Sequence, residues 1–275
     1  MQRLQQHIQA QAHQGRIDEA TLTALAAQAH CSLLQAQYAA CCCGVMPARY
    51  ARNAGYFSCA EQAQLLTSHA LLVGLGGLGG TVLEQLARAG VGHITGIDGD
   101  SIEESNDNRQ LLASTATRGQ NKATAAAARV QAINPACQFS PVPRYCHSIA
   151  EFAAHMATAQ VVIDALGGLT HRLLLHTAAS QANLTTVSAG IAGFTGWCAV
   201  LLPHQTGPLQ RLGTENTGES ADTILGNPAP TAVVAAGMQA AAVLHLLTQR
   251  PVMHNTCFFD LADGSFMQVD FEEKV

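Results

Sequence analysis

The period of the hydrophobic positions changes several times along this chain. Short apolar runs of strand length cover residues 70–73, 93–97, 138–142 and 160–163. The segments between them carry apolar residues at helical spacing, as in residues 80–89. Strands that alternate with helices in this way are typical of a parallel sheet covered by helices. We therefore expect an α/β fold with a Rossmann-like, mostly parallel sheet and helices on both of its faces.

The remaining elements complete this fold and add a helical segment in front of it. Residues 1–45 predict two or three short helices, which we interpret as a small N-terminal appendage to a main domain at 46–275. Residues 203–227 show little periodicity, so we expect a long loop there. The other predicted elements are helices at 61–66, 122–133, 149–157, 169–181 and 228–247, and strands at 184–188, 195–202, 256–260 and 265–269, the last two paired as a hairpin.

Composition narrows the possible classes of protein. Charged residues make up 12% of the chain and the net charge is −5, so we expect no nucleic-acid partner. The N-terminus lacks the apolar stretch of a signal peptide. The apolar run 231–247 is interrupted by Gly237, Gln239 and His245, which favours a buried helix over a membrane span. The nine cysteines include no C-x-x-C pair, so we expect reduced thiols in a cytoplasmic protein without a zinc site.

A glycine motif follows the strand predicted at 70–73. The pattern is Gly74-x-Gly76-x-x-Gly79, and Asp98 stands about twenty residues further on, at the end of the next strand. Gly74 permits a tight turn, Gly76 lets the backbone approach a phosphate, and Gly79 lets the helix lie close to the strand. The helix N-terminus then offers free N–H groups to a phosphate, and Asp98 can accept hydrogen bonds from a ribose. This order of elements predicts a nucleotide site.

Two segments after Asp98 add candidate chemistry to this site. Residues 99–110 are mostly polar and follow a strand, which is where an open α/β protein binds its ligands. Lys122 lies on the first turn of a predicted helix, although the helix dipole repels a cation at that end. A bound phosphate would explain a lysine in this position.

These residues, in this order, resemble the HesA/MoeB/ThiF family, the bacterial relatives of ubiquitin-activating enzymes. The resemblance runs from Arg49 to the C-terminus. It implies an enzyme that binds ATP and Mg²⁺ and adenylylates the C-terminal glycine carboxylate of a small ubiquitin-like sulfur carrier, of the MoaD or ThiS kind. The matching motifs are Arg49-Tyr50-Ala51-Arg52-Asn53, Gly74-Leu75-Gly76-Gly77-Leu78-Gly79, Asp98-x-Asp100, Ser105-Asn106-x-x-Arg109-Gln110, Gly119-x-x-Lys122 and Asn134-Pro135.

The resemblance also implies a role for each motif residue. Asp98 would hold the ribose, and Asn106 would orient the phosphates. Arg109 and Lys122 would neutralise the charge that moves towards pyrophosphate during the reaction. Arg52 would reach across a homodimer interface to the leaving phosphates of the partner's site. We assign the remaining cofactor contacts to Gly74, Gly76, Gly77, Gly79, Asp100 and Asp164.

The chain departs from the family pattern at the metal site. The family usually has an acid three residues after the aspartate that ends the fourth strand, and that acid binds the magnesium. Here Gly167 takes its place after Asp164, and a glycine has no side chain that can bind a metal. Either Asp164 or Asp100 would replace the acid, or the magnesium site is weakened, so the metal ligands stay open. The loop at 203–227 also contains no cysteine, so we expect no thioester with the enzyme.

Three functions remain to be compared. The first is ATP-dependent adenylylation of a carrier carboxylate, which uses every motif residue. The second is a non-catalytic nucleotide-binding or scaffold relative, which Gly167 favours. The third is an NAD-dependent oxidoreductase, which the glycine motif and Asp98 alone would allow; it leaves Asn106, Arg109 and Lys122 unexplained. We expect the first.

Overall fold

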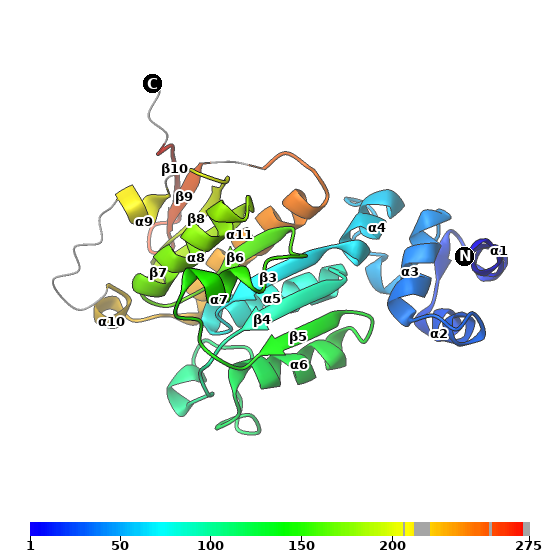
Figure 1. The fold of residues 1–275 in the computed structure, drawn as a ribbon, viewed down its shortest axis with the longest axis horizontal. Coiled ribbons are helices and arrows are strands. Elements are labelled where there is room, and N and C mark those ends of the chain that lie inside the picture. Colours follow the sequence, from blue (N-terminus) through cyan, green and yellow to red (C-terminus); the bar gives the residue numbers. More distant parts are fainter. Residues whose placement is uncertain (206, 212–220, 253–254, 272–275) are drawn as a thin grey trace.

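An eight-stranded sheet runs through the computed structural model, which describes residues 1–205, 207–211, 221–252 and 255–271 (Figure 1). Its strand order is β10-β9-β8-β7-β6-β3-β4-β5. The strands from β5 to β7 are parallel, and β8, β9 and β10 continue the sheet in antiparallel pairing. The strands are β3 (His69–Val73), β4 (His93–Ile97), β5 (Gln138–Val142), β6 (Val161–Asp164), β7 (Thr186–Ala192), β8 (Thr195–Leu201), β9 (Thr256–Asp260) and β10 (Ser265–Val269).

Helices cover both faces of the sheet, as the sequence predicts. Successive residues of a strand point to opposite faces, and β3 accordingly serves two cores: Ala70 and Leu72 belong to one, Leu71 and Val73 to the other. The first core is closed by α5 (Gly77–Ala89), α6 (Lys122–Ile133) and α11 (Ala229–Leu247), and the second by α7 (Ile149–Ala153) and α8 (Thr170–Gln181). The predicted α/β fold class is confirmed.

The helix α11 is long and apolar enough to cross a membrane by length and composition alone. In this structure it packs against α5 and against the strands β6, β7 and β8. Ala235, Ala236 and Val243 are buried in the first core, and Gln239 donates hydrogen bonds from its amide to the carbonyl oxygens of Asp164 and Val187. These contacts are those of the buried core helix that the sequence predicts.

Three short helices precede the sheet and have a core of their own. They are α1 (Gln2–Gln11), α2 (Glu19–Gln28) and α3 (Leu33–Cys42), and they lie at the end of the sheet away from α10 (Figure 1). A two-residue parallel pair links β1 (Arg16–Ile17), between α1 and α2, with β2 (Met46–Pro47), which follows α3. The chain then passes through the short helix η1 (Ala48–Tyr50) and α4 (Cys59–Thr67) into β3. The predicted helices are confirmed, and their separation as a domain stays a prediction.

The structure differs from the sequence prediction in three places. The strand β7 extends to Ala192 rather than ending near 188, because it pairs with β8 along its whole length. The helix α7 ends at Ala153 and continues only as turns. The expectation of a structureless loop at 203–227 was wrong for α9 (Pro208–Arg211) and α10 (Ala221–Leu225); residues 206 and 212–220 of that loop lie outside the described residues.

Candidate functional site

A cavity of about 1150 Å³ lies at the carboxyl ends of the parallel strands. Its wall includes residues within two positions of the ends of four of them: Gly74 after β3, Asp98 after β4, Arg144 after β5 and Ala165 after β6. Ligands bind outside the carboxyl ends of the strands in open α/β sheets. The cavity therefore lies where the sequence places the nucleotide site.

The glycine turn between β3 and α5 leaves no room for a side chain at Gly74 or Gly79. A Cβ atom on Gly79 would lie 1.8 Å from the carbonyl oxygen of Gly74, and one on Gly74 would lie 2.5 Å from that of Ala165. Gly74 also has a φ of 90°, which favours glycine. Helix α5 therefore lies directly on β3, and its first turn, which begins after Gly76 and has no side-chain cap among the described residues, meets the cavity.

Asp98 ties the glycine turn to the end of β4. One carboxylate oxygen accepts a hydrogen bond from the Leu75 N–H at 2.7 Å, and the other accepts one from the Asp100 N–H at 2.8 Å. Burial raises the pKa of Asp98 above its ordinary value, although these two N–H groups act in the opposite direction. Each oxygen keeps a second lone pair, so the carboxylate can still accept hydrogen bonds from a ribose.

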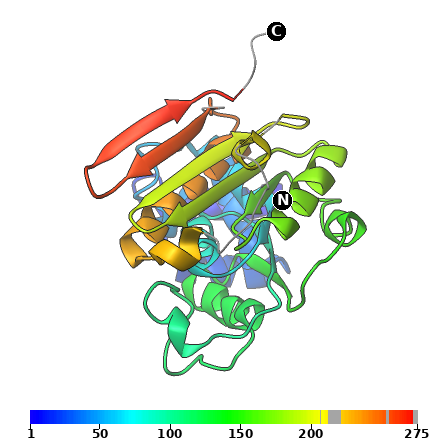
Figure 2. The ribbon, with the colours of Figure 1, turned by 90° about the vertical axis from the view of Figure 1, so that its left-hand side faces the viewer.

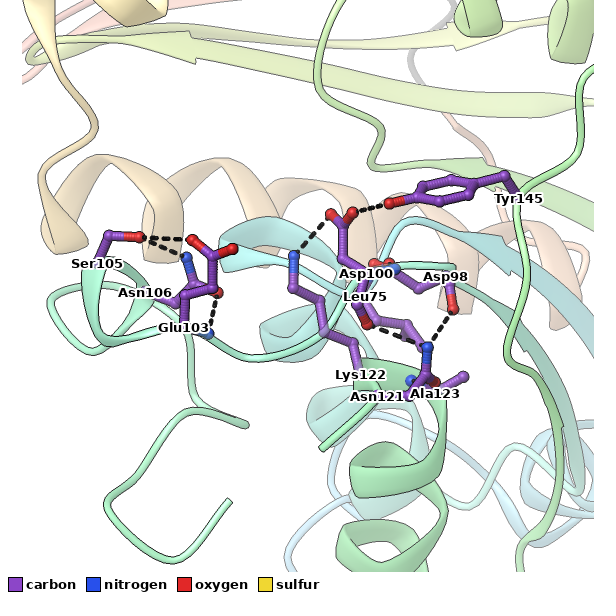
Figure 3. Close-up of polar contacts among 10 residues, drawn as sticks. All are labelled: Leu75, Asp98, Asp100, Glu103, Ser105, Asn106, Asn121, Lys122, Ala123 and Tyr145. Carbon is purple, nitrogen blue, oxygen red and sulfur yellow. Dashed lines mark hydrogen bonds and ion pairs between the residues drawn. The ribbon is translucent and has the colours of Figure 1, made fainter. Parts of the chain in front are cut away.

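Lys122 and Asp100 form an ion pair at the cavity wall (Figure 3). The Lys122 ammonium lies 2.9 Å from a carboxylate oxygen of Asp100, and the Tyr145 hydroxyl donates a hydrogen bond to the other oxygen. Burial raises the pKa of Asp100, but Tyr145 and Lys122 lower it by more, so the group stays ionised. The side chain of Lys122 is 8% exposed and that of Asp100 is 49% exposed. Asp100 can therefore turn to water when another anion takes its place at the lysine.

Arg109 and Asn106, two further residues predicted for the site, lie differently relative to the cavity. Arg109 lines the cavity and is held by the carbonyl oxygen of Ser105 and the amide oxygen of Asn108. Asn106 is buried in the short helix η2 (Glu104–Asn106), where its amide oxygen accepts a hydrogen bond from the Glu103 N–H. Asn106 is not among the described residues that line the cavity, so here it shapes the loop that carries Arg109.

Asp164 is fully buried beneath the cavity and is not among its described lining residues. Its carboxylate binds the His176 ring at 2.8 Å, the Ser188 hydroxyl at 2.6 Å and the Arg172 guanidinium at 3.5 Å. Burial raises the pKa of Asp164, but Arg172, His176 and Ser188 together lower it by more, to about 2. The carboxylate is thus the counter-ion of a buried arginine.

Gly167 lines the cavity where the family has its acid. A Cβ atom added there would meet no atom within 4 Å, so the position is open to the cavity. Among the described residues no group of three or more histidines, cysteines, aspartates or glutamates could hold a metal ion. The carboxylates of Asp98 and Asp100 both have protein partners on each oxygen. These residues do not fit a magnesium site built by the protein.

Arg52 is exposed and lies away from the cavity of its own chain. It stands between two anchored tyrosines. Tyr50 binds the amides of Gln37 and of Asn134, the latter just after α6, and Tyr56 binds His245 near the end of α11. Because α6 begins at the cavity wall and runs away from it, this segment sits at the opposite end of the sheet. Arg52 makes no described hydrogen bond or ion pair, so its guanidinium is free to meet another molecule.

Sequence reasoning missed several residues that the fold brings to the cavity. Gln110 lines it with an amide oxygen that is buried and has no described partner. Tyr145 comes from the segment after β5, and Arg172 from α8, where its guanidinium also donates to the carbonyl oxygens of Leu166 and Ala189. Trp197 lines the cavity from β8. Only Gln110 stood within a motif, so packing alone identifies the other three.

Known proteins are similar to the part of this chain that forms the sheet and the cavity. Residues 50–274 match the ThiF family. The chain is 34% identical over 212 residues to the molybdopterin-synthase adenylyltransferase of Escherichia coli, which covers 76% of this chain and 85% of that protein. It is 34% identical over 152 residues to the SAMP-activating enzyme E1 of Haloferax volcanii, which covers 54% of each. The crystal structure of E. coli MccB with ATP is similar in fold, with a TM-score of 0.70 and 22% identity over 81% of this chain and 70% of that one.

We predict that Asp164→Asn destabilises the fold rather than acting through a metal. The substitution leaves Arg172, which is 6% exposed, without its counter-ion, and breaking a buried pair in this way costs about 3–5 kcal/mol. Because the folded-state pKa of Asp164 lies below its unfolded value, this stabilisation is present above about pH 4 and is lost as the pH falls through 2. Urea unfolding at pH 7 measures the change.

The matched control is Glu104→Gln, which removes a carboxylate that is 82% exposed and paired with Arg118. It should change the free energy of unfolding by less than about 1 kcal/mol. If Asp164→Asn proved as stable as wild type and lost nucleotide binding instead, the carboxylate would be a ligand group and our assignment would be wrong.

Proposed function

The chain belongs to the ThiF family, and on that premise we propose that it is an ATP-dependent adenylyltransferase acting on the C-terminal carboxylate of a small ubiquitin-like sulfur-carrier protein. One observation carries the proposal: a glycine turn, an acid for the ribose and two cations for the phosphates come from separate parts of the sequence and line one cavity. The family resemblance inferred from the motifs is confirmed by the match over residues 50–274. The relatives named above are adenylyltransferases or activating enzymes.

In this proposal ATP lies across the turn between β3 and α5. The ribose hydroxyls bind the free lone pairs of Asp98, and the phosphates approach Gly76 and Gly77, where no side chain intervenes. A phosphate then replaces Asp100 as the partner of Lys122. The half-exposed Asp100 carboxylate can turn into water and be hydrated there, whereas the buried Lys122 ammonium needs an anionic partner. Arg109, whose side chain lies next to Gly77, contacts the phosphates there.

The reaction that follows is a displacement at the α-phosphorus. A carboxylate oxygen of the carrier attacks that phosphorus, the bond to the bridging oxygen of the β-phosphate breaks, and pyrophosphate leaves with the electron pair. Negative charge grows on the leaving phosphates, and Lys122 and Arg109 are placed to stabilise it. The product is an acyl-adenylate that a separate sulfur donor consumes. No described cysteine lines the cavity except Cys146, which is 4% exposed, so a thioester plays no part in the proposal.

Magnesium enters this proposal only with the nucleotide. Gly167 offers no ligand, Asp164 is the buried partner of Arg172, and each Asp98 oxygen accepts a backbone N–H. Asp100, once a phosphate has displaced it from Lys122, is the one carboxylate of this set left to contact the ion. Magnesium is usually bound by one or two carboxylates together with phosphate oxygens and water. We therefore assign the phosphates rather than the protein as its principal ligands, and the role proposed from the sequence for Asp164 is replaced by a structural one.

Arg52 and a homodimer complete the proposal. The segment that carries Arg52 is fixed at both ends, by Tyr50 on one side and by Tyr56 on the other, and it faces away from the cavity of its own chain. Because Arg52 is exposed and is not among the described residues that line this cavity, any part it plays in the reaction would be at a site on another subunit. Its contribution to the leaving phosphates would be that of an arginine supplied in trans, which can be worth several orders of magnitude in rate.

A second candidate is a relative that binds the nucleotide without activating a substrate. Gly167 is the specific observation that favours it, since the residue that binds the family's metal is missing. The set of Arg109, Lys122 and Asp98 at one cavity would hold a nucleotide under either candidate, and the similarity to an adenylyltransferase and an activating enzyme favours the enzyme.

We predict that Asp98→Ala weakens ATP binding by about 1.5–3 kcal/mol, through loss of hydrogen bonds to a charged acceptor. Isothermal titration calorimetry with ATP measures the change, and circular dichroism checks that the variant folds. Asp98→Asn is the matched control: it keeps one acceptor oxygen and should fall between wild type and alanine. An unchanged ATP affinity in Asp98→Ala would remove the ribose assignment.

We predict that mixing two inactive variants restores part of the activity. When Arg52→Ala subunits are mixed with Lys122→Ala subunits, a hybrid dimer contains one site with both side chains intact if Arg52 acts in trans. Adenylylation should recover to a fraction of the wild-type rate. A mixture of Arg52→Ala with the double variant Arg52→Ala/Lys122→Ala is the control and should stay inactive. No recovery in the first mixture would mean that each site is built within one chain.

A further inference from the structure

A strip of apolar side chains crosses the antiparallel half of the sheet. The strand registers place four residues directly opposite one another: Gly190 on β7, Trp197 on β8, Phe258 on β9 and Met267 on β10. All four line the cavity. The Trp197 ring lies on Gly190, where a Cβ atom would come within 2.7 Å of the indole nitrogen. We call these four residues the cross-strand strip.

The cross-strand strip lies on the face of the sheet opposite α11. Side chains alternate along a strand, and the neighbours Ala189, Cys198 and Phe259 point into the core that α11 covers. On the strip's own face, α7 and α8 close the second core beside β6, while the hairpin of β9 and β10 lies beyond them at the edge of the sheet (Figure 2). Trp197 and Phe258 are half-buried, and Met267 is 60% exposed.

The strip is continuous with the nucleotide half of the cavity. Gly167, Arg172 and Gly190 line the wall between the two halves, and the Arg172 guanidinium carbon lies 5.8 Å from the centre of the Trp197 ring. A cavity of about 1150 Å³ also exceeds the roughly 300–1000 Å³ that a single small ligand occupies. There is thus room beside the nucleotide for part of a second substrate.

We propose that the cross-strand strip binds the C-terminal tail of the acyl substrate and selects a tail with a bulky apolar side chain next to its terminal glycines. This rests on the proposed function, because the reacting carboxylate must come to about 3–3.5 Å from the α-phosphorus. The glycine turn, Asp98 and Lys122 take up the nucleotide half, so the tail enters over the strip. A tail held there in extended form directs alternate side chains towards Trp197 and Phe258.

The chemistry of the strip selects the side chain. Trp197, Phe258 and Met267 offer apolar contact area and, in the part of the chain that the structure describes, no charged group within the strip itself. An apolar side chain that leaves water there gains free energy in proportion to the area buried. An acidic side chain in the same place would lose solvation, and the cation beside the strip, Arg172, is already paired with Asp164.

Trp197 is the one tryptophan of the chain, so its fluorescence reports directly on this surface. The probes are two short synthetic peptides that both end in Gly-Gly, with phenylalanine or aspartate immediately before the glycines. In the presence of ATP, the phenylalanine peptide should change the Trp197 emission saturably, at a half-saturating concentration at least about tenfold below that of the aspartate peptide. Equal half-saturation by the two peptides would overturn the proposal.

Substitutions test whether the cross-strand strip, rather than another part of the sheet, binds the peptide. In ATP–pyrophosphate exchange, Trp197→Ala and Phe258→Ala should each raise the KM for the phenylalanine peptide about tenfold and leave kcat within about twofold. The matched control is Phe266→Ala, an aromatic residue on β10 that is 60% exposed and stacks on Phe259 on the other face; it should keep the wild-type KM. A preference for phenylalanine that survives Trp197→Ala would also overturn the proposal.

The experiments distinguish a failure of the cross-strand strip from a failure of the proposed catalysis. If the phenylalanine peptide binds preferentially and Phe258→Ala, which keeps the Trp197 fluorophore, removes the preference, but no exchange occurs with any substrate, the strip is supported and the proposed catalysis is wrong. If exchange proceeds and neither the peptides nor the variants show a preference, the catalysis is supported and the strip has no role in selecting the tail.

Discussion

The close approach of α5 to β3 is the constraint on which the site depends. The first turn of α5 rests on the backbone of the glycine turn, so closely that a methyl group on Gly79 would overlap the carbonyl oxygen of Gly74. This contact fixes where the helix begins and points its first N–H groups into the cavity. Asp98 holds the Leu75 N–H and thereby locks the turn to β4. In the proposed nucleotide site, these two contacts would set the position of the phosphates relative to the ribose.

Two buried cations near the cavity are paired with different kinds of carboxylate. The difference indicates which cation is available to a ligand and which one stabilises the fold. Lys122 is paired with Asp100, which is half-exposed and therefore exchangeable. Arg172 is paired with Asp164, which is fully buried and also binds His176 and Ser188. Only the first pair can open for a ligand without leaving a carboxylate buried and unpaired. The second pair holds the chain after β6 in place, and with it the open position at Gly167.

Local patterns in the sequence predicted the parallel half of the fold and several of the residues that line the cavity. The turn, the acid and the lysine are each recognisable from their immediate neighbours, because a strand end or a helix start gives them their direction. The surroundings of Asp164 could not be predicted in this way, because Arg172 and His176, which pair with its buried carboxylate, come from α8.

The part of the cavity lined by the cross-strand strip could not be predicted in the same way. The cross-strand strip depends on the registers of four strands, and Tyr145 reaches Asp100 only because the segment after β5 folds back over Gly99. Neither arrangement leaves a periodic signal in the chain.

Exchange of labelled pyrophosphate into ATP tests the central claim most directly, since it requires reversible formation of an acyl-adenylate. Wild-type protein, supplied with ubiquitin-like carrier proteins, should catalyse the exchange with at least one carrier. The exchange should disappear when the carrier lacks its C-terminal glycine and when the enzyme carries Lys122→Ala. Wild-type protein that binds ATP but gives no exchange with any carrier would contradict the account and leave the binding-only function in its place.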